Sequence, residues 1–186
     1  GLHIDKDHFM TISPDEGSMN RAIYLANVLG VDMGMYYKRL DYSRYVNGRH
    51  PIAAYEFLGP KIEGKDMILI DDMISSGDTI IKIASLLKEK GAGRVYICST
   101  FGFFTDGLDK FDDAYKKGYF DKLLTTNLVY QSPELLEKPY YISCDMSKYI
   151  ALIIDTLNHD NSVSHLLNPV DRIKRCVTNY MSQHEK

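Results

Sequence analysis

The sequence predicts a three-layer α/β domain, with a mainly parallel, twisted sheet and helices on both faces. Short apolar runs alternate with amphipathic helical segments along most of the chain. Some runs, such as residues 94–100 (RVYICST), are apolar almost throughout, which is typical of parallel strands buried on both faces. With 186 residues the chain is long enough for one domain with a full hydrophobic core.

The apolar pattern places the elements in a clear order. Strands are expected at 8–13, 33–37, 52–58, 66–71, 94–100, 122–126 and 140–143. Helices are expected at 18–29, 77–90, 107–117 and 146–158. Parallel strands of such a sheet bring the loops that follow them to one edge, where ligands bind.

Two segments lack this pattern. Residues 38–51 (KRLDYSRYVNGRHP) carry four cationic side chains and an Asn-Gly turn, and we expect them to form a loop. From residue 169 the chain is polar, which indicates a surface helix or a partly ordered tail. The expected organisation is therefore a domain over 1–168 followed by a tail over 169–186.

Composition excludes several classes of protein. The net charge of -3 argues against a non-specific nucleic-acid binder. No apolar run approaches the roughly 18 residues of a membrane span, and the polar start shows no signal peptide, so a cytoplasmic protein is expected. Cys98, Cys144 and Cys176 are widely spaced and odd in number, which favours reduced thiols over a zinc site or a disulfide framework.

The segment 67–79 (MILIDDMISSGDT) carries the strongest functional signal. A buried strand ends in Asp71 and Asp72, and a small polar turn then opens a helix. Such a turn offers free backbone N–H groups, and the helix dipole favours negative charge there. The candidate anion-binding residues are Ser75, Ser76, Gly77, Asp78 and Thr79. The alternative is an ordinary capped helix start.

The acidic pair suits a different ligand. Consecutive strand residues point to opposite sides, and no Lys or Arg is adjacent in the sequence. Carboxylates in this setting accept hydrogen bonds from vicinal hydroxyls or meet a divalent cation. Alternatively, one of the two caps the following turn. We expect the side chain of Asp78 to point to solvent.

The same segment resembles the phosphoribosyl-pyrophosphate (PRPP) signature of the type I phosphoribosyltransferase fold. Four further segments resemble ribose-phosphate pyrophosphokinases, the enzymes that make PRPP: ISPDEG (12–17), YKR (37–39), GAGRVYICSTFGFF (91–104) and SVSHLL (162–167). The order and spacing agree over nearly all of residues 10–168. The resemblance covers only the second half of those enzymes.

The resemblance implies a role for each candidate residue. Asp71 and Asp72 would hold the ribose hydroxyls, and the turn would hold the 5-phosphate. Asp15 would help to bind Mg²⁺, while Lys38 and Arg39 would be catalytic. The substrates would be ribose 5-phosphate and ATP, the products would be PRPP and AMP, and a homo-oligomer is expected.

The chain also departs from that family. Leu40 stands where a KRR pattern has its second arginine, and Ser18 replaces the second glycine of SPDxGG. The family's first half, which supplies most of the ATP site and a magnesium-binding histidine, is not matched. The isolated domain is therefore expected to be inactive or weak by itself.

Two other functions stay open at this point. One is a catalytically weak or inactive regulatory subunit, which Leu40 favours. The other is a phosphoribosyltransferase that consumes PRPP. That class needs a hood segment to recognise a nucleobase, and the chain before residue 8 is too short to supply one.

Overall fold

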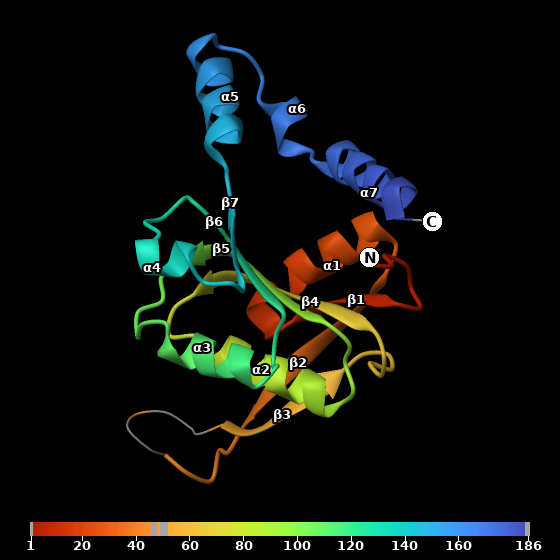
Figure 1. The fold of residues 1–186 in the computed structure, drawn as a ribbon, viewed down its shortest axis with the longest axis vertical. Coiled ribbons are helices and arrows are strands. Elements are labelled where there is room, and N and C mark those ends of the chain that lie inside the picture. The colour runs from red at the N-terminus through yellow and green to blue at the C-terminus, as the bar shows by residue number, and fades with distance from the viewer. Residues whose placement is uncertain (1, 46–47, 49–51, 185–186) are drawn as a thin grey trace.

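A computed structural model describes residues 2–45, 48 and 52–184, and within them seven strands form one sheet. The strand order is β3-β2-β1-β4-β5-β6-β7, and every neighbouring pair is parallel except β2 with β3 (Figure 1). The strands are β1 (Phe9–Ser13), β2 (Asp32–Leu40), β3 (Ile52–Leu58), β4 (Asp66–Ile74), β5 (Val95–Gly102), β6 (Lys122–Thr126) and β7 (Tyr141–Cys144). The mainly parallel sheet predicted from the sequence is confirmed.

Helices cover both faces of this sheet (Figure 1). The helical elements are η1 (Glu16–Ser18, 3₁₀), α1 (Met19–Leu29), α2 (Asp78–Glu89), α3 (Asp109–Lys116), α4 (Pro133–Leu136), α5 (Ser147–Asn158), α6 (Ser164–Leu167) and α7 (Val170–His184). Helix α1 packs on one face through Ala26, beside Phe9 and Val31. Helices α2 and α3 pack on the other face, which gives the three layers.

The apolar periodicity explains the packing. All five residues of β1 are buried, as expected for a central parallel strand. Helix α2 turns one stripe toward the sheet, in which Ile80, Ile83, Ala84 and Leu87 are fully or almost fully buried. Removing such side chains from water is the main favourable term in folding.

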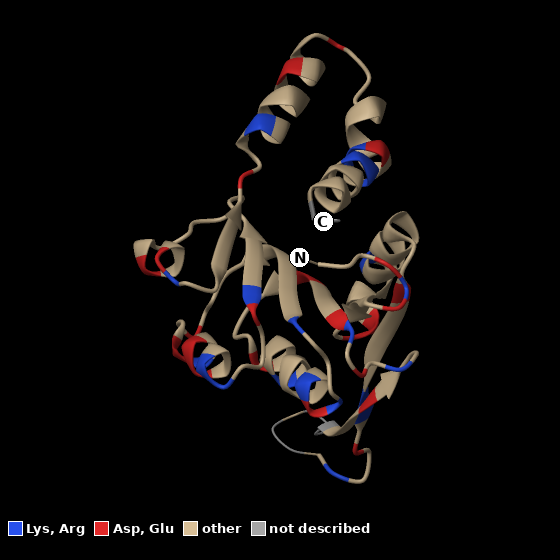
Figure 2. Cartoon of the chain, turned by 45° about the vertical axis from the view of Figure 1, so that its right-hand side comes forward, with Lys and Arg blue, Asp and Glu red and all other residues tan. Residues whose placement is uncertain are grey.

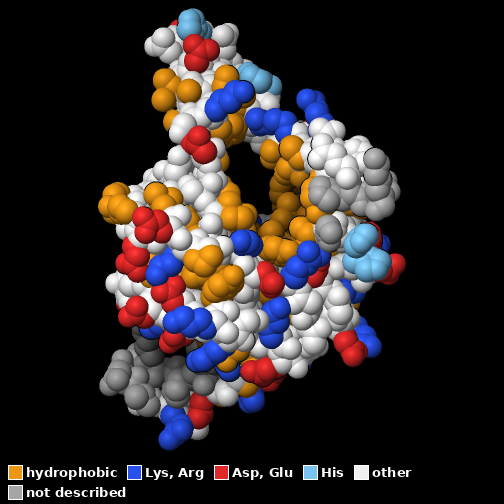
Figure 3. Space-filling model, viewed as in Figure 1, with side chains coloured by type: hydrophobic (Ala, Val, Ile, Leu, Met, Phe, Trp, Pro, Cys, Tyr) orange, Lys and Arg blue, Asp and Glu red, His pale blue; other side chains and the backbone are white. Residues whose placement is uncertain are grey.

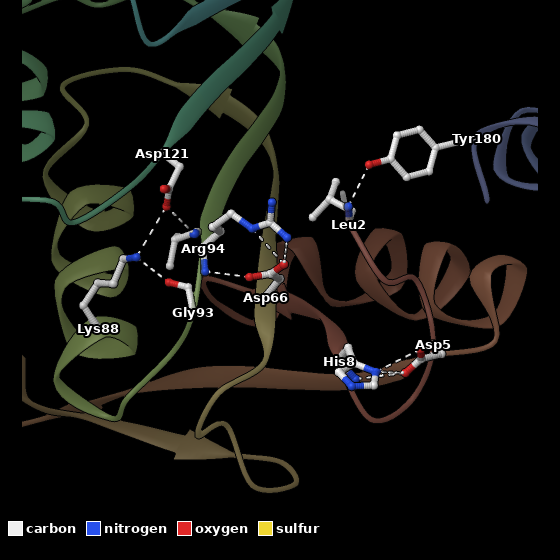
Figure 4. Close-up of polar contacts among 10 residues, drawn as sticks. Leu2, Asp5, His8, Asp66, Lys88, Gly93, Arg94, Asp121 and Tyr180 are labelled. Carbon is white, nitrogen blue, oxygen red and sulfur yellow. Dashed lines mark hydrogen bonds and ion pairs between the residues drawn. The ribbon is translucent and has the colours of Figure 1, made fainter. Parts of the chain in front are cut away.

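Charged side chains tie the strands together at their amino ends (Figure 4). Asp66, at the start of β4, accepts hydrogen bonds from the backbone N–H of Arg94 at 2.7 Å and from its Nη2 at 2.6 Å. Asp121, just before β6, accepts a hydrogen bond from the backbone N–H of Val95 at 2.8 Å. These contacts join the starts of β4, β5 and β6.

Strands β2 and β4 each run three residues past their predicted carboxyl ends. Strand β2 continues to Leu40, with Lys38 opposite Tyr55 and Arg39 opposite Ala54 of β3, so the predicted loop does not begin at Lys38. Strand β4 continues to Ile74 through pairing with β5, so Asp71 and Asp72 lie inside the strand. In both cases hydrogen bonding to a neighbouring strand overrides the local loss of apolar pattern. The rest of the predicted loop at 46–47 and 49–51 lies outside the described residues.

The C-terminal helices extend from the sheet (Figure 1). Helix α5 buries only Thr156, and its apolar residues Ile154 and Leu157 are exposed. Hydrophobic side chains line the opening between these helices and the body (Figure 3). The predicted tail contains helix α7, which lies beside α1, and the Tyr180 hydroxyl accepts a hydrogen bond from the Leu2 N–H at 2.7 Å. Within the described residues, no helix is long and apolar enough to cross a membrane.

We expect the free thiols to differ sharply in reactivity. Burial raises the pKa of Cys98 to about 11, so at about pH 8 its thiolate fraction is on the order of 0.1%. Cys176 on α7 is exposed. Labelling with a chromogenic disulfide reagent should show Cys176 reacting at least about a hundredfold faster than Cys98. In denaturant both thiols should react alike, and fast labelling of Cys98 in the folded protein would contradict the expectation.

Candidate functional site

The carboxyl ends of β1 and β4 lie at the same edge of the sheet because the two strands are parallel neighbours. Asp15 follows β1, and the polar turn follows β4. A pocket of about 150 Å³ opens between them. It is lined by Asp15, Asp71, Met73, Ile74, Ser75, Ser76, Gly77, Asp78, Thr79 and Ile80. The structure thus brings the predicted turn together with two of the predicted carboxylates.

Gly77 forms the corner between the turn and helix α2. Its φ of 84° is in the left-handed region, which side chains with a Cβ rarely adopt. A Cβ at this position would also lie 2.2 Å from Cζ of Phe111 on α3. The corner therefore requires glycine for two separate reasons. The helix that starts here directs its first N–H groups, which have no intrahelical partner, toward the pocket end.

The two serine hydroxyls of the turn already have partners within the protein. Ser75 Oγ lies 3.3 Å from Oγ1 of Thr105, and Ser76 Oγ donates to Asp78 Oδ2 at 3.0 Å. Asp78 is mostly exposed, as expected, but its Oδ1 also accepts a hydrogen bond from Lys110 Nζ at 2.7 Å. Lys110 and then Ser76 lower the pKa of the Asp78 carboxyl.

The acidic pair makes contacts that the sequence does not reveal. Asp71 Oδ1 accepts hydrogen bonds from Ser18 Oγ at 2.6 Å and from the backbone N–H of Asp72 at 2.8 Å. Asp72 Oδ2 lies 3.7 Å from Nη2 of Arg21. Both carboxylates therefore reach the segment 18–21, so Asp72 has an arginine nearby in space although none is adjacent in the sequence.

The environment of Asp71 disfavours its charge. Desolvation raises the pKa of this carboxyl most, and the neighbouring Asp72 and Asp15 raise it further. The hydrogen bonds from Ser18 and the Asp72 N–H act in the opposite direction. A hydroxyl donor or a cation placed beside Asp71 would relieve this penalty, which makes it a suitable ligand for either.

Asp15 links this pocket to a second one. It caps η1 by accepting a hydrogen bond from the Gly17 N–H at 3.0 Å, and its Oδ2 pairs with Lys38 Nζ at 3.1 Å. The second pocket, of about 340 Å³, is lined by Asp15, Glu16, Gly17, Lys38 and Leu40. Lys38 and Leu40 share one side of β2, as residues two apart in a strand do.

Arg39 lies apart from these groups. Its Nε donates to Glu56 Oε1 of β3 at 2.8 Å, and it does not line either pocket. The structure therefore places Lys38 beside the candidate site and does not place Arg39 there.

Four residues around the site escape the sequence prediction: Ser18, Arg21, Thr105 and Lys110. Thr105 and Lys110 follow β5, so the rule that ligands bind beyond the carboxyl ends of strands could have pointed to them. In the sequence, Ser18 stands out only as a departure from a glycine. No sequence signal marks Arg21.

The carboxylates fit a loosely held divalent cation. Among the described residues, no three His, Cys, Asp or Glu side chains are grouped to hold a metal by themselves. Mg²⁺ typically uses only one or two carboxylates together with water and substrate phosphates. Asp15 and Asp71 line the same pocket, so these two could share such an ion with a phosphate ligand.

The sheet order and the pocket at its carboxyl edge define a phosphoribosyltransferase-like α/β domain. A crystal structure of phosphoribosylpyrophosphate synthetase from Mycobacterium smegmatis has the same fold, with a TM-score of 0.68 at 23% identity. The match covers 82% of this chain and 46% of that one. Residues 49–168 match the phosphoribosyl synthetase-associated domain, and the chain belongs to this family.

Curated relatives agree with this assignment. The ribose-phosphate pyrophosphokinase of Vibrio parahaemolyticus is 29% identical over 163 residues, covering 87% of this chain and 49% of the relative. That of Thermococcus kodakarensis is 31% identical over 121 residues, covering 64% and 39%. The chain thus spans about half the length, or less, of these relatives. The resemblance to a PRPP synthetase domain, stated from sequence motifs, is confirmed.

Replacing Gly77 by alanine should destabilise the fold by about 2–4 kcal/mol, since a left-handed residue and an overlap with Phe111 add their costs. Gly118→Ala is the matched control, because Gly118 also has a positive φ, of 71°, but no atom within 4 Å of the added Cβ. It should cost only about 1–2 kcal/mol. Chemical denaturation measures both changes, and equal costs would show that Phe111 does not constrain Gly77.

Asp71→Asn should become more stabilising, relative to wild type, as the pH rises. The raised pKa means that folded wild type loses stability as pH increases from the unfolded pKa, near 3.9, through the folded pKa. Asparagine lacks this penalty and its Oδ1 can still accept from Ser18. Unfolding free energies measured between about pH 3 and 7 test this expectation.

Asp145→Asn is the control with the opposite sign. Hydrogen bonds from Ser147 lower the pKa of Asp145, so its charge stabilises the fold above the unfolded pKa. This variant should therefore lose stability relative to wild type as the pH rises over the same range. If Asp71→Asn also lost stability relative to wild type as the pH rose, the raised pKa of Asp71 would be refuted.

Proposed function

We propose that this chain is the ribose 5-phosphate-binding domain of a ribose-phosphate pyrophosphokinase. The complete enzyme would transfer the diphosphoryl group of MgATP to ribose 5-phosphate, giving PRPP and AMP. One observation carries the proposal: a single pocket joins the Ser75–Thr79 turn, at the start of α2, with Asp71 and Asp15. The names of the relatives support the same activity.

Two parts of the substrate would contact two different sets of residues. The 5-phosphate would bind the backbone N–H groups and hydroxyls of Ser75, Ser76, Gly77, Asp78 and Thr79. The ribose hydroxyls would donate hydrogen bonds to Asp71, which lines the pocket, and to its neighbour Asp72, which does not line it. Ser18 and the Asp72 N–H both donate to Asp71 Oδ1, which fixes the carboxylate and leaves Oδ2 for the sugar.

Transfer of the diphosphoryl group needs positive charge at the phosphates. Lys38 would supply part of it by exchanging its ion pair with Asp15 for the transferring group. Mg²⁺, when bound, would neutralise phosphate charge, and Asp15 would help to hold it. Arg39 would have to leave Glu56 to take part.

The organisation of the complete protein is part of this proposal. The functional unit would be residues 1–168, with 169–186 as an appended segment. ATP would bind mainly to the part of the relatives that this chain does not span. By the same resemblance we propose a cytoplasmic homo-oligomer.

A non-catalytic regulatory role is the second candidate. Leu40 favours it, because its side chain lines the pocket beside Lys38 where a charged residue would help transfer. Such a protein would bind a complete synthetase without turnover of its own. Co-purification with an active synthetase, and no PRPP formed by this protein alone at full length, would select this candidate.

We expect ribose 5-phosphate to bind one site per chain in isothermal titration calorimetry with Mg²⁺ present. Asp71→Asn should weaken binding by at least about tenfold, because a charged acceptor for the sugar hydroxyls is lost. Unphosphorylated ribose should bind far more weakly, since the turn then has no anion. Asp145→Asn, away from the pocket, should bind as wild type does. No heat with any phosphosugar would refute the proposed function.

A further inference from the structure

A chain of polar contacts connects the turn after β4 to the segment after β5. Thr105 Oγ1 lies 3.3 Å from Ser75 Oγ and donates to Asp106 Oδ1 at 3.3 Å. Asp106 Oδ2 accepts a hydrogen bond from Lys110 Nζ at 2.9 Å. Lys110 in turn donates to Asp78 Oδ1, and Asp78 Oδ2 accepts from Ser76. The contacts therefore run from Ser75 through α3 and back to Ser76.

These contacts bear on the repulsion between the Asp78 carboxylate and a bound phosphate. Asp78 lines the pocket that would take a phosphate, so its carboxylate and the ligand carry charge of the same sign. The partial positive charge at the start of α2 stabilises an anion there, but the Asp78 carboxylate already interacts with that charge. Repulsion at this range weakens binding unless a cation offsets it. Acidic and basic residues lie close together on the helices that cover this face (Figure 2).

Lys110 is the cation placed to offset that charge. Its ammonium group contacts both Asp78 and Asp106 from α3. Lys110 itself does not line the pocket, so it acts there only through Asp78. Asp78, Asp106 and Lys110 together carry one net negative charge. Without Lys110, the two carboxylates carry two negative charges. Both oxygens of Asp78 are engaged, one by Lys110 and one by Ser76, which fixes the carboxylate in one orientation.

We propose that Lys110 is a positioning residue of the phosphate pocket. By pairing with Asp78, it cancels most of that charge and holds the carboxylate in place, so that the turn can accept a phosphate monoester. The inference rests on the proposed function, since it concerns the same pocket. It adds a residue from α3 to a site that the sequence motif confines to the turn.

Binding measurements on the full chain test the inference. The proteins are wild type, Lys110→Met, Asp78→Asn, the double variant and Lys117→Met. Lys117 is the matched control because it removes one charge from the other end of α3, roughly 10 Å along the helix axis. The probes are ribose 5-phosphate and inorganic phosphate. Their binding is measured by calorimetry and by changes in the amide NMR signals of residues 75–79.

Each variant has a defined expected result. Lys110→Met should weaken ribose 5-phosphate binding about 3–10-fold at low salt, a modest effect because the pair is partly exposed. Asp78→Asn should tighten binding, and the double variant should return close to wild type. Lys117→Met should stay within about twofold. A purely structural role of Lys110 would not be rescued by Asp78→Asn.

The outcomes separate this inference from the proposed function. If ribose 5-phosphate binds but Lys110→Met has no effect, or the double variant binds as weakly as Lys110→Met, the inference is wrong and the function stands. If only inorganic phosphate binds, with the expected variant pattern, Lys110 has the inferred role and the proposed function fails. If neither probe shifts the signals of residues 75–79, both are overturned.

Discussion

The parallel pairing of β4 with β1 on one side and β5 on the other is the constraint on which the site depends. Leu69 lies opposite Ile12, and Asp71 lies opposite Ser99, so three strand ends finish close together. This register brings Asp15 from the first strand to a turn that lies about sixty residues later in the chain. The clamp of Asp66 on Arg94 fixes β4 against β5 at the opposite end.

Carboxylates at the two ends of the sheet have different surroundings. At the amino ends, carboxylates such as Asp66 and Asp121 meet cationic or N–H donors and favour the folded state. At the carboxyl ends, Asp71 is half-buried among other acids, which costs stability. An unfavourably placed charge of this kind is common where a protein must bind a ligand, because the ligand supplies the hydrogen-bond donor or cation that the carboxylate lacks.

The sequence was sufficient for the mainly parallel sheet and its longer helices, because their apolar periods are local signals. It also singled out the turn after β4, which the structure places in one pocket with Asp15 and Asp71. It failed at the end of β2 and within β4, where hydrogen bonds to a neighbouring strand decide how far each strand runs. Arg39 was expected beside Lys38 at the site, yet strand alternation carries it to Glu56. Arg21 and Lys110 reach the site from other elements, so no pattern near residues 71–79 could indicate them.

The contact of Gly77 with Phe111 also bears on how this turn can change over evolutionary time. The Ser75 and Ser76 hydroxyls contact Thr105 and Asp78, and other small hydroxyl side chains would satisfy the same geometry. Gly77 has no such freedom, because its backbone and the aromatic ring each exclude a side chain. Any drift there requires a coordinated change in α3. The turn is therefore open to variation in composition but closed to variation in shape.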